Sequence, residues 1–187
     1  MALILLRHTR PAGAEGLCYG RSDLRLAPCF QTRAAQLERE LPTFSRVLSS
    51  PLSRCLRLAR ALAAARDVGL AVDARLIEMD FGAWEGIPWD AIPRAELDAW
   101  ADDLESANPH GGERVADLAV RARTALREAA QHKDTGGTGP ALVVTHAGVI
   151  KSALATMQGA AGWKAELGFG QWLRLDAALA PVPARVD

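Results

Sequence analysis

The sequence lacks the marks of several protein classes. Its three cysteines, Cys18, Cys29 and Cys55, are odd in number and form no CxxC pair, which predicts reduced thiols rather than a disulfide framework or a zinc knuckle. No apolar run approaches the roughly 20 residues that a membrane span needs. The N-terminus shows neither a charged region nor a cleavage site, so we expect a cytoplasmic protein that makes no membrane contact.

An excess of charge of one sign is also missing. Lys plus Arg and Asp plus Glu number 22 each, so the chain has no overall basic field with which to gather nucleic acid. Any affinity for phosphate must therefore be local. With 187 residues, 49% of them hydrophobic, and no internal repeat or linker, we expect one domain over residues 1–187 with a full core.

Apolar runs alternate with amphipathic segments along the whole chain. The runs predict strands at 2–6, within 46–51, and at 68–72, 141–144 and 170–175, and the helical spacing predicts helices at 31–41, 53–62, 114–132 and 149–157, with part of 89–104. Glycine-rich stretches predict loops at 13–28 and 134–140, and the tail from residue 177 is expected to be loosely held. This alternation is typical of an α/β fold, a mainly parallel sheet covered by helices on both faces.

Reactive side chains follow two of these expected strands. Arg7 and His8 come directly after the first strand, and His146 comes after the strand that begins at Ala141. Open α/β sheets place their chemistry at the carboxyl ends of the strands. The two strand ends are therefore the first places to look for an active site.

The arginines in this pattern are suited to phosphate. Arginine binds a phosphate through two parallel charge-assisted bonds, and Arg54 lies in the first turn of a predicted helix, where backbone amides add to the attraction. Arg7 and Arg54 are therefore the expected phosphate ligands. The alternative for Arg54 is a solvated ion pair on the helix surface.

Histidine beside such a clamp can attack phosphorus and form a phosphohistidine. We expect His8 to be this nucleophile and His146 to donate a third bond to the phosphate. A core histidine bonded to a backbone carbonyl is the alternative for His146. The other two histidines are expected to be structural, with His110 in a turn and His132 at a helix end.

A phosphatase also needs a proton donor for the leaving alcohol, and the same group can later accept a proton from water. Glu78 is the first candidate, because it stands where the apolar pair Leu76 and Ile77 gives way to an irregular loop. Asp80 and Glu85 compete for the role from the same segment, and a solvated loop acid is the alternative for each of them.

Several motifs occur together and in a fixed order. They are Leu6-Arg7-His8-Thr9-x-Pro11, Ser50-Pro51-Leu52-x-Arg54-Cys55, Leu76-Ile77-Glu78-Met79-Asp80-Phe81-Gly82-x-Trp84-Glu85-Gly86, Gly111-Gly112-Glu113 and Val144-Thr145-His146-Ala147-Gly148. In this order the chain resembles the histidine phosphatase superfamily, with its phosphoglycerate-mutase-like fold. The resemblance covers residue 3 to about residue 157, and all the motifs together are far more specific than any one of them.

The resemblance implies a phosphorylated His8, a phosphate pocket completed by Arg7, Arg54 and His146, and Glu78 as proton donor and acceptor. Within the superfamily, the residues at 16–23 and at 78–82 look most like those of the α-ribazole phosphatases of cobalamin biosynthesis. We expect substrate contacts from Tyr19, Gly20 and Arg21. The chain departs from the family at Arg114, where serine is commoner, and at His110. Both lie on a loop that could bear on specificity.

The sequence therefore predicts a phosphomonoesterase that needs neither metal nor cofactor and acts on α-ribazole 5′-phosphate or a similar small ester. A phosphoglycerate mutase is the first rival, although the stretch 78–111 offers few cations for a substrate carboxylate. The others are an inactive phosphate-binding module and a zinc hydrolase built on His8, His146 and Glu78, against which the flanking arginines argue. Either a monomer or a homodimer is compatible with the sequence.

Overall fold

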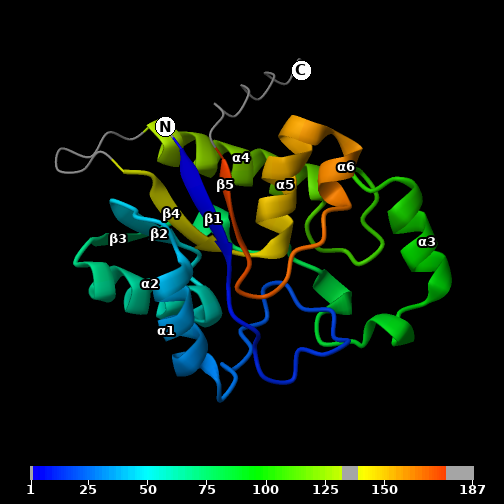
Figure 1. Cartoon of the computed structure of the whole chain (residues 1–187). Helices are drawn as coiled ribbons and strands as arrows, with labels where there is room; N and C mark the ends of the chain where they lie inside the picture. The colour runs from blue at the N-terminus through cyan, green and yellow to red at the C-terminus, as the bar shows by residue number, and fades with distance from the viewer. Residues whose placement is uncertain (1, 132–138, 176–187) are drawn as a thin grey trace.

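The strands form one mixed sheet. The computed structural model describes residues 2–131 and 139–175, and its five strands are ordered β3-β2-β4-β1-β5 (Figure 1). Their bounds are β1 Leu3–Arg7, β2 Arg46–Ser49, β3 Gly69–Val72, β4 Ala141–Thr145 and β5 Trp172–Leu175. Every pairing is parallel except that of β5 with β1. The predicted α/β fold with a mainly parallel sheet is confirmed.

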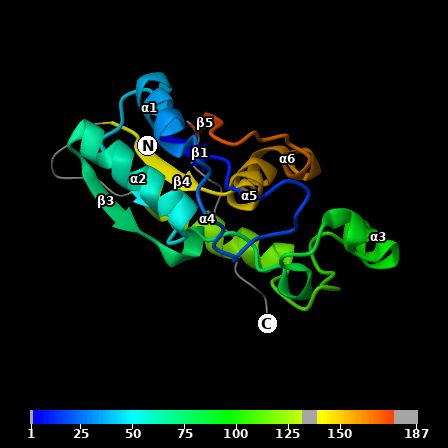
Figure 2. The same ribbon diagram turned by 90° about the horizontal axis from the view of Figure 1, so that it is seen from below.

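Helices cover both faces of the sheet, because successive apolar side chains of β1 point to opposite faces and each set must be buried. Ile4 and Leu6 point into a core shared with α1 (Phe30–Glu40) and α2 (Ser53–Arg66), whereas Leu3 and Leu5 point into a core shared with α4 (Val115–Gln131) and α5 (Ala147–Gln158). Figure 2, seen from below, shows the strands between these two helical layers. A strand buried on both faces explains why residues 3–6 are all apolar.

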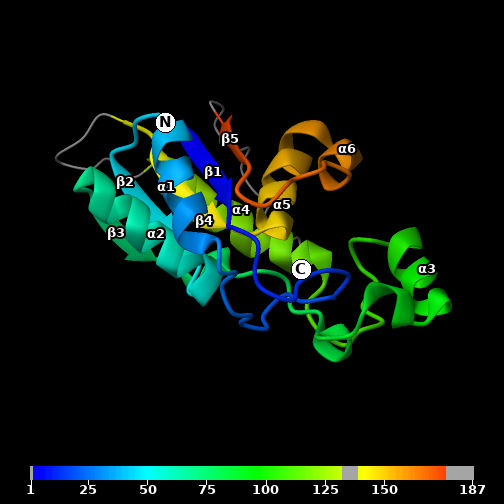
Figure 3. The same ribbon diagram turned by 60° about the horizontal axis from the view of Figure 1, so that its bottom comes forward.

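The segment between β3 and α4 is built from short elements. Three 3₁₀ turns, Ala74–Leu76, Gly82–Trp84 and Trp89–Ala91, lead to α3 (Arg94–Asp102), which begins directly after Pro93. In Figure 3, α3 stands at the end of the molecule farthest from β3. A four-residue helix that the sequence did not predict, α6 (Ala160–Trp163), follows α5, and it is too short to leave a periodic signal.

The loop over 13–28 contains no helix or strand and is fixed by two isolated bridges, Pro11 with Leu26 and Leu17 with Pro88. In Figure 3 it is the blue segment that runs from the end of β1 past the strand ends toward α3. This confirms the predicted loop. Of the predicted loop at 134–140 the structure describes only residues 139 and 140, and His132 and the tail from residue 177 lie outside the described residues.

Two further expectations concern the cysteines and the membrane. All three cysteines are free thiols, and Cys18 and Cys55 are buried. Within residues 2–131 and 139–175, no helix has the length and apolar character to cross a membrane. That residues 1–187 form a single domain stays a prediction.

Candidate active site

The register of the sheet brings the two histidines together. Arg7 pairs with Thr145 across β1 and β4, and the backbone N–H of His8 donates to the Thr145 carbonyl at 3.0 Å. The next residue on each strand is a histidine, and the two imidazole centroids lie 5.1 Å apart. Two strands that are far apart in the sequence thus meet at one reactive edge.

A cavity of about 480 Å³ opens at this edge. Its polar end is lined by Arg7, His8, Arg54 and Glu78, and Tyr19 adds a ring close to Arg54, with the guanidinium carbon 5.3 Å from the ring centroid. The remaining wall is mostly apolar. Four of the five side chains predicted to do the chemistry therefore line one cavity.

His8 is buried and held in a single tautomer. Its Nδ1 lies 2.7 Å from the Thr9 carbonyl, which can only accept, so Nδ1 carries the hydrogen and Nε2 keeps its lone pair. Burial, together with the nearby positive charges of Arg54 and Arg7, lowers the His8 pKa to about 3. A neutral imidazole with a free Nε2 has the form that a nucleophile needs.

Arg54 is the second residue of α2 and is fully buried. Its Nη1 donates to the Ser22 carbonyl at 2.7 Å and its Nη2 to the Gly20 carbonyl at 2.5 Å, whereas Nε has no partner among the described residues. The alternative of a solvated ion pair on the helix surface is wrong, because the side chain has no exposed surface.

Arg7 reaches the cavity from the end of β1. Its guanidinium carbon lies 3.9 Å from the centroid of the Phe169 ring, and Nη1 donates to the Leu167 carbonyl. Its Nε, like that of Arg54, is buried without a partner in the described part of the chain. Because a buried donor without an acceptor is costly, both arginines have hydrogen-bonding capacity left for an anion.

His146 lies behind His8 rather than on the cavity wall. It is fully buried at the start of α5, and its Nε2 lies 2.8 Å from the Ser50 hydroxyl and 3.4 Å from the Cys55 sulfur. Burial chiefly, and then the charges of the site, lower its pKa well below the usual value. The partners of the His146 ring are thus a hydroxyl and a thiol, and not the backbone carbonyl expected for a purely structural core histidine. The role of His146 as a phosphate donor stays a prediction.

Glu78 lies on the cavity wall with its carboxylate fixed by two backbone groups. Oε1 accepts a hydrogen bond from the backbone N–H of the next residue, Met79, at 3.0 Å, and Oε2 accepts one from the Gly148 N–H at 3.1 Å. Gly148 belongs to the first turn of α5, whose free amides favour an anion. The carboxylate is thus placed at the same strand ends as His8.

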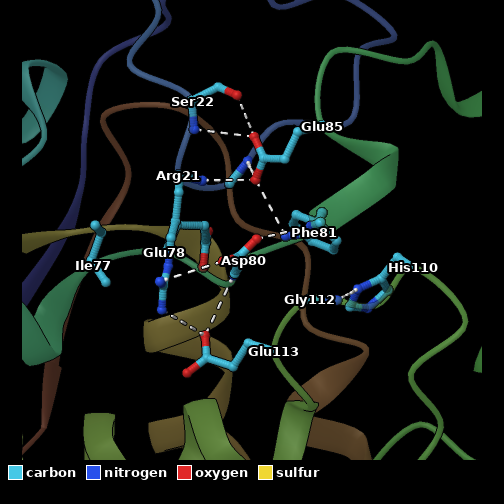
Figure 4. A network of polar contacts seen from close by, with 12 residues as sticks. Arg21, Ser22, Ile77, Glu78, Asp80, Phe81, Glu85, His110, Gly112 and Glu113 are labelled. Carbon is cyan, nitrogen blue, oxygen red and sulfur yellow. Dashed lines mark hydrogen bonds and ion pairs between the residues drawn. The ribbon is translucent and has the colours of Figure 1, made fainter.

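The two rival acids have other partners (Figure 4). Glu85 accepts the N–H groups of Gly20, Arg21 and Ser22 at 2.9–3.0 Å, and also the Ser22 hydroxyl. Asp80 accepts the Gly82 N–H at 2.9 Å and pairs with Arg21 at 3.4 Å. Neither lines the cavity. Both carboxylates hold loops in place, which leaves Glu78 as the acid on the cavity wall.

The predicted substrate contacts are only partly on this wall. Tyr19 lines the cavity, but Gly20 and Arg21 do not. The Arg21 guanidinium is directed to Asp80 and to Glu113, the latter at 3.9 Å (Figure 4). An added Cβ at Gly20 would overlap the Met79 carbonyl, so this glycine is required for close loop packing. Substrate contacts from Gly20 and Arg21 stay predictions.

One residue that the sequence did not indicate holds the backbone of the Glu78 segment in place. Arg121 on α4 donates to the backbone carbonyls of Arg75, Ile77 and Glu78 and forms a two-bond ion pair with Glu113. Glu113 was visible in the Gly-Gly-Glu motif. Arg121, eight residues later in an ordinary amphipathic helix, has no local signal that distinguishes it.

The two residues at which the chain departs from the family pattern, His110 and Arg114, do not line the cavity. His110 is buried and accepts the Gly112 N–H on Nδ1 at 3.1 Å (Figure 4). Its ring lies edge-on to that of Trp84, with the two centroids 4.9 Å apart. Arg114 is paired with Asp117 at 2.8 Å on the surface. Neither residue lines the cavity, so the structure gives neither a direct contact with a substrate bound there.

The zinc hydrolase alternative needs a metal site on His8, His146 and Glu78. In the described ranges, no three or more side chains of histidine, cysteine, aspartate or glutamate gather closely enough to hold an ion. His8 and Glu78 share the cavity wall with two arginines, whose charge opposes a cation there. Independence from metal stays a prediction.

Comparisons with known proteins show what this chain is similar to. Residues 3–176 match the model of the histidine phosphatase superfamily (branch 1). The chain is 32% identical over 190 residues to a glucosyl-3-phosphoglycerate phosphatase of Mycolicibacterium vanbaalenii, covering 92% of this chain and 83% of that protein. It is 30% identical over 186 residues to an adenosylcobalamin/α-ribazole phosphatase of Salmonella typhimurium, covering 94% and 90%.

Among solved structures, a phosphoglycerate mutase from Thermus thermophilus superposes with a TM-score of 0.74 at 25% identity, covering 97% of this chain and all of that one. The predicted phosphoglycerate-mutase-like fold is therefore confirmed. At 32% against 30% identity, the likeness to the glucosyl-3-phosphoglycerate phosphatase is slightly greater than that to the α-ribazole phosphatase, so the predicted greater likeness to α-ribazole phosphatases is not confirmed.

Proposed function

This chain belongs to branch 1 of the histidine phosphatase superfamily and is a phosphatase of small phosphate esters, and we propose that it works through a phosphohistidine formed on His8. The observation that carries the proposal is the composition of one cavity wall. A neutral imidazole, two arginines with unpaired buried donors and one backbone-anchored carboxylate share it.

In the first step, Nε2 of His8 attacks phosphorus while the bond to the leaving oxygen breaks. Arg7 and Arg54 hold the equatorial oxygens, and the carboxyl of Glu78 gives its proton to the leaving alcohol. In the second step, water attacks the phosphohistidine, Glu78 takes a proton from it, and the N–P bond breaks. Inorganic phosphate leaves, and the imidazole and the carboxyl group return to their starting forms.

The substrate is a small ester, with α-ribazole 5′-phosphate and glucosyl-3-phosphoglycerate as the two candidates. Relatives that are named for each of these substrates, at 30% and 32% identity, support them about equally. The cavity supports either, because its aromatic wall can stack on a heterocycle or on the apolar face of a sugar ring. The sequence motifs at 16–23 favour α-ribazole 5′-phosphate.

The mutase and the inactive binding module remain the alternatives to be tested. Within 78–111 the only cationic side chain apart from histidine is Arg94, which is exposed and paired with Asp98, and this scarcity supports hydrolysis. A coupled assay for interconverted phosphoglycerates separates a mutase from a phosphatase. A binding module would release no phosphate from an aryl ester.

The decisive experiment traps the intermediate. After a brief incubation with a ³²P-labelled ester and a denaturing quench, the wild type should carry an acid-labile, base-stable label that peptide mapping places at His8. His8→Ala and His8→Asn should carry no label and release no phosphate, with unchanged circular dichroism as the folding control. A label that survives hot acid, or phosphate release by the folded variants, would contradict the proposal.

A further inference from the structure

Residues 167–171, which lead into β5, fold back onto the end of β1 (Figure 1). The backbone N–H of Gly170 donates to the carbonyls of Arg7 and His8 at 3.1 Å, and the Arg7 N–H donates to the Gln171 carbonyl at 3.0 Å. These bonds join backbone atoms only. The loop is therefore tied to the strand end that carries His8, whichever side chain stands at position 169.

Phe169, in the middle of this loop, places its ring on the cavity wall beside the reactive pair. The Arg7 guanidinium carbon lies 3.9 Å from the ring centroid, and the centroid of the His8 imidazole lies 5.6 Å from it. A second guanidinium, that of Arg10, is farther away at 5.0 Å, is exposed and is paired with Glu15. Arg7 is thus the cation in closest contact with the ring.

This contact compensates for the burial of the Arg7 charge. Burial is the chief cause that lowers the pKa of the Arg7 guanidinium from its usual value, because it disfavours the charged form. Among the described residues Arg7 forms no ion pair, and its Nε has no acceptor. An aromatic face attracts a guanidinium through the ring quadrupole and leaves its N–H groups unused. The ring can therefore hold Arg7 while the unpaired donor stays available to an anion.

The two arginines of the proposed phosphate site are held in different ways. Arg54 is fixed by two loop carbonyls, to which its terminal nitrogens donate at 2.7 and 2.5 Å. Arg7 gives one such bond, from Nη1 to the Leu167 carbonyl, and otherwise lies against the Phe169 ring. The position of Arg7 therefore depends on an aromatic face, whereas that of Arg54 depends on the loop backbone.

We propose that Phe169 is a positioning residue, whose ring face holds the Arg7 guanidinium toward the phosphoryl group. The inference rests on the proposed phosphatase function, in which Arg7 binds the equatorial oxygens. Without the ring the long Arg7 side chain would sample several rotamers, and binding of an anion would have to order it again. Loss of the ring should therefore weaken binding of the phosphoryl group, whichever alcohol is attached to it.

The test measures the binding of inorganic phosphate by isothermal titration calorimetry, which requires no turnover. Phe169→Leu keeps an apolar side chain but removes the ring, and it should raise the Kd about 3- to 30-fold, the range of one cation–π contact. Phe169→Tyr keeps the ring face and should bind phosphate as the wild type does. The backbone bonds of the loop are the same in both variants, so the comparison isolates the ring.

A double-mutant cycle shows whether the ring acts through Arg7. In an Arg7→Met background, Phe169→Leu should raise the Kd no further, because the cation that the ring holds is absent. Phe44→Leu is the matched control. The Phe44 ring also faces an arginine, Arg66 at 5.8 Å, but it is buried in the core shared with α1 and α2 and does not line the cavity. This variant should lose stability and bind phosphate as the wild type does.

Steady-state kinetics provides a second signature. In Phe169→Leu, kcat/KM should fall by the same factor on p-nitrophenyl phosphate and on an alkyl ester such as glycerol 3-phosphate, because both present the same phosphoryl group to Arg7. A wild-type Kd in Phe169→Leu, or an equal rise in Kd in the Arg7→Met background, would overturn the inference. A loss confined to one ester would also overturn it, since the ring would then serve the leaving group.

Failure of the proposed function gives a different result. A wild type that binds phosphate but hydrolyses neither ester contradicts the phosphatase, and the titrations still decide the role of Phe169. A wild type that binds no phosphate overturns the inference, because Arg7 then has no anion toward which the ring could hold it.

Discussion

Single residues in this site serve both the loop structure and the chemistry, and Arg54 is the clearest example. Its two terminal nitrogens donate to the carbonyls of Ser22 and Gly20, which positions the loop beside the cavity. Burial is the chief cause that lowers the His8 pKa, and the charge of Arg54 lowers it further. A planar guanidinium can bind two carbonyls and still face an anion, whereas a lysine ammonium cannot reproduce this fork.

We therefore predict that Arg54→Lys loses about 2–4 kcal/mol of transition-state stabilisation, by analogy with the removal of one oxyanion donor. The measurement is kcat/KM on an aryl phosphate. Arg57→Lys, three residues along the same helix and exposed, is the matched control and should be unaffected. Wild-type kcat/KM in the Arg54 variant would show that the guanidinium contributes nothing to the reaction.

A second prediction at this scale concerns proton transfer by Glu78. Glu78→Gln keeps the shape and can still accept one of the two backbone N–H groups, but it can no longer give up a proton. An alkyl alcohol needs that proton and nitrophenolate does not, so phosphorylation of His8 by the aryl ester should suffer much less.

Rapid-mixing kinetics provides the measurement. Since breakdown of the phosphohistidine still needs a base, the variant should show a burst of nitrophenolate followed by slow turnover. Equal slowing of alkyl and aryl phosphorylation would exclude Glu78 as the acid and return attention to Asp80 and Glu85.

At the scale of elements, the start of α5 organises the site. The helix begins directly after His146, its first turn supplies the Gly148 N–H to Glu78, and its next turn brings Lys151 to the cavity. An added Cβ at Gly148 would overlap Oε1 of Glu78 and come within 3.1 Å of Leu118 Cδ2. The glycine is needed here for close approach of the carboxylate.

Gly148→Ala should therefore displace the Glu78 carboxylate and lower kcat. The free energy of unfolding should change by about 1 kcal/mol or less, because the preference for alanine over glycine in a helix opposes the cost of these close contacts. Activity and urea unfolding measured on the same preparation check this prediction. Gly69→Ala is the control, since nothing lies within 4 Å of an added Cβ there. Unchanged kcat in Gly148→Ala would mean that the position of Glu78 is not critical.

At the scale of the whole molecule, three histidines are buried in neutral form. Burial is the chief cause that lowers the pKa of His8, His110 and His146 from the usual 6.5, to about 3 in the case of His8. The unfolded chain binds protons at these positions below pH 6.5, whereas the folded chain excludes them. Stability must therefore fall as the pH decreases from 6.5 toward 3.

We predict a lower free energy of unfolding at pH 5 than at pH 7, with each histidine contributing up to about 1.4 kcal/mol per pH unit. Urea unfolding across this range gives the measurement. The carboxyls with lowered pKa, such as Asp73 and Glu85, start from 3.8 and 4.5 in the unfolded chain, so most of their effect on stability comes below pH 5. His110→Asn should reduce the slope, and an unchanged slope in that variant would contradict the assignment for His110.

The sequence by itself determined the features that depend on near neighbours. Period and turn residues located the strands of the sheet and the main helices, and the order of the motifs placed His8 and His146 at strand ends. Such features follow from local burial, because a strand buried on both faces must be apolar throughout and its end is where polar residues become possible. The glycines at 13–28 likewise predicted the loop there.

Only the tertiary structure decided among candidates of equal local character. Glu78, Asp80 and Glu85 look alike in sequence, but the Gly148 N–H selects the first, while the backbone of residues 20–22 occupies Glu85. Arg121 is an ordinary helix cation until packing directs it to three backbone carbonyls. Their roles depend on partners that are distant in the chain, so no local pattern can contain them.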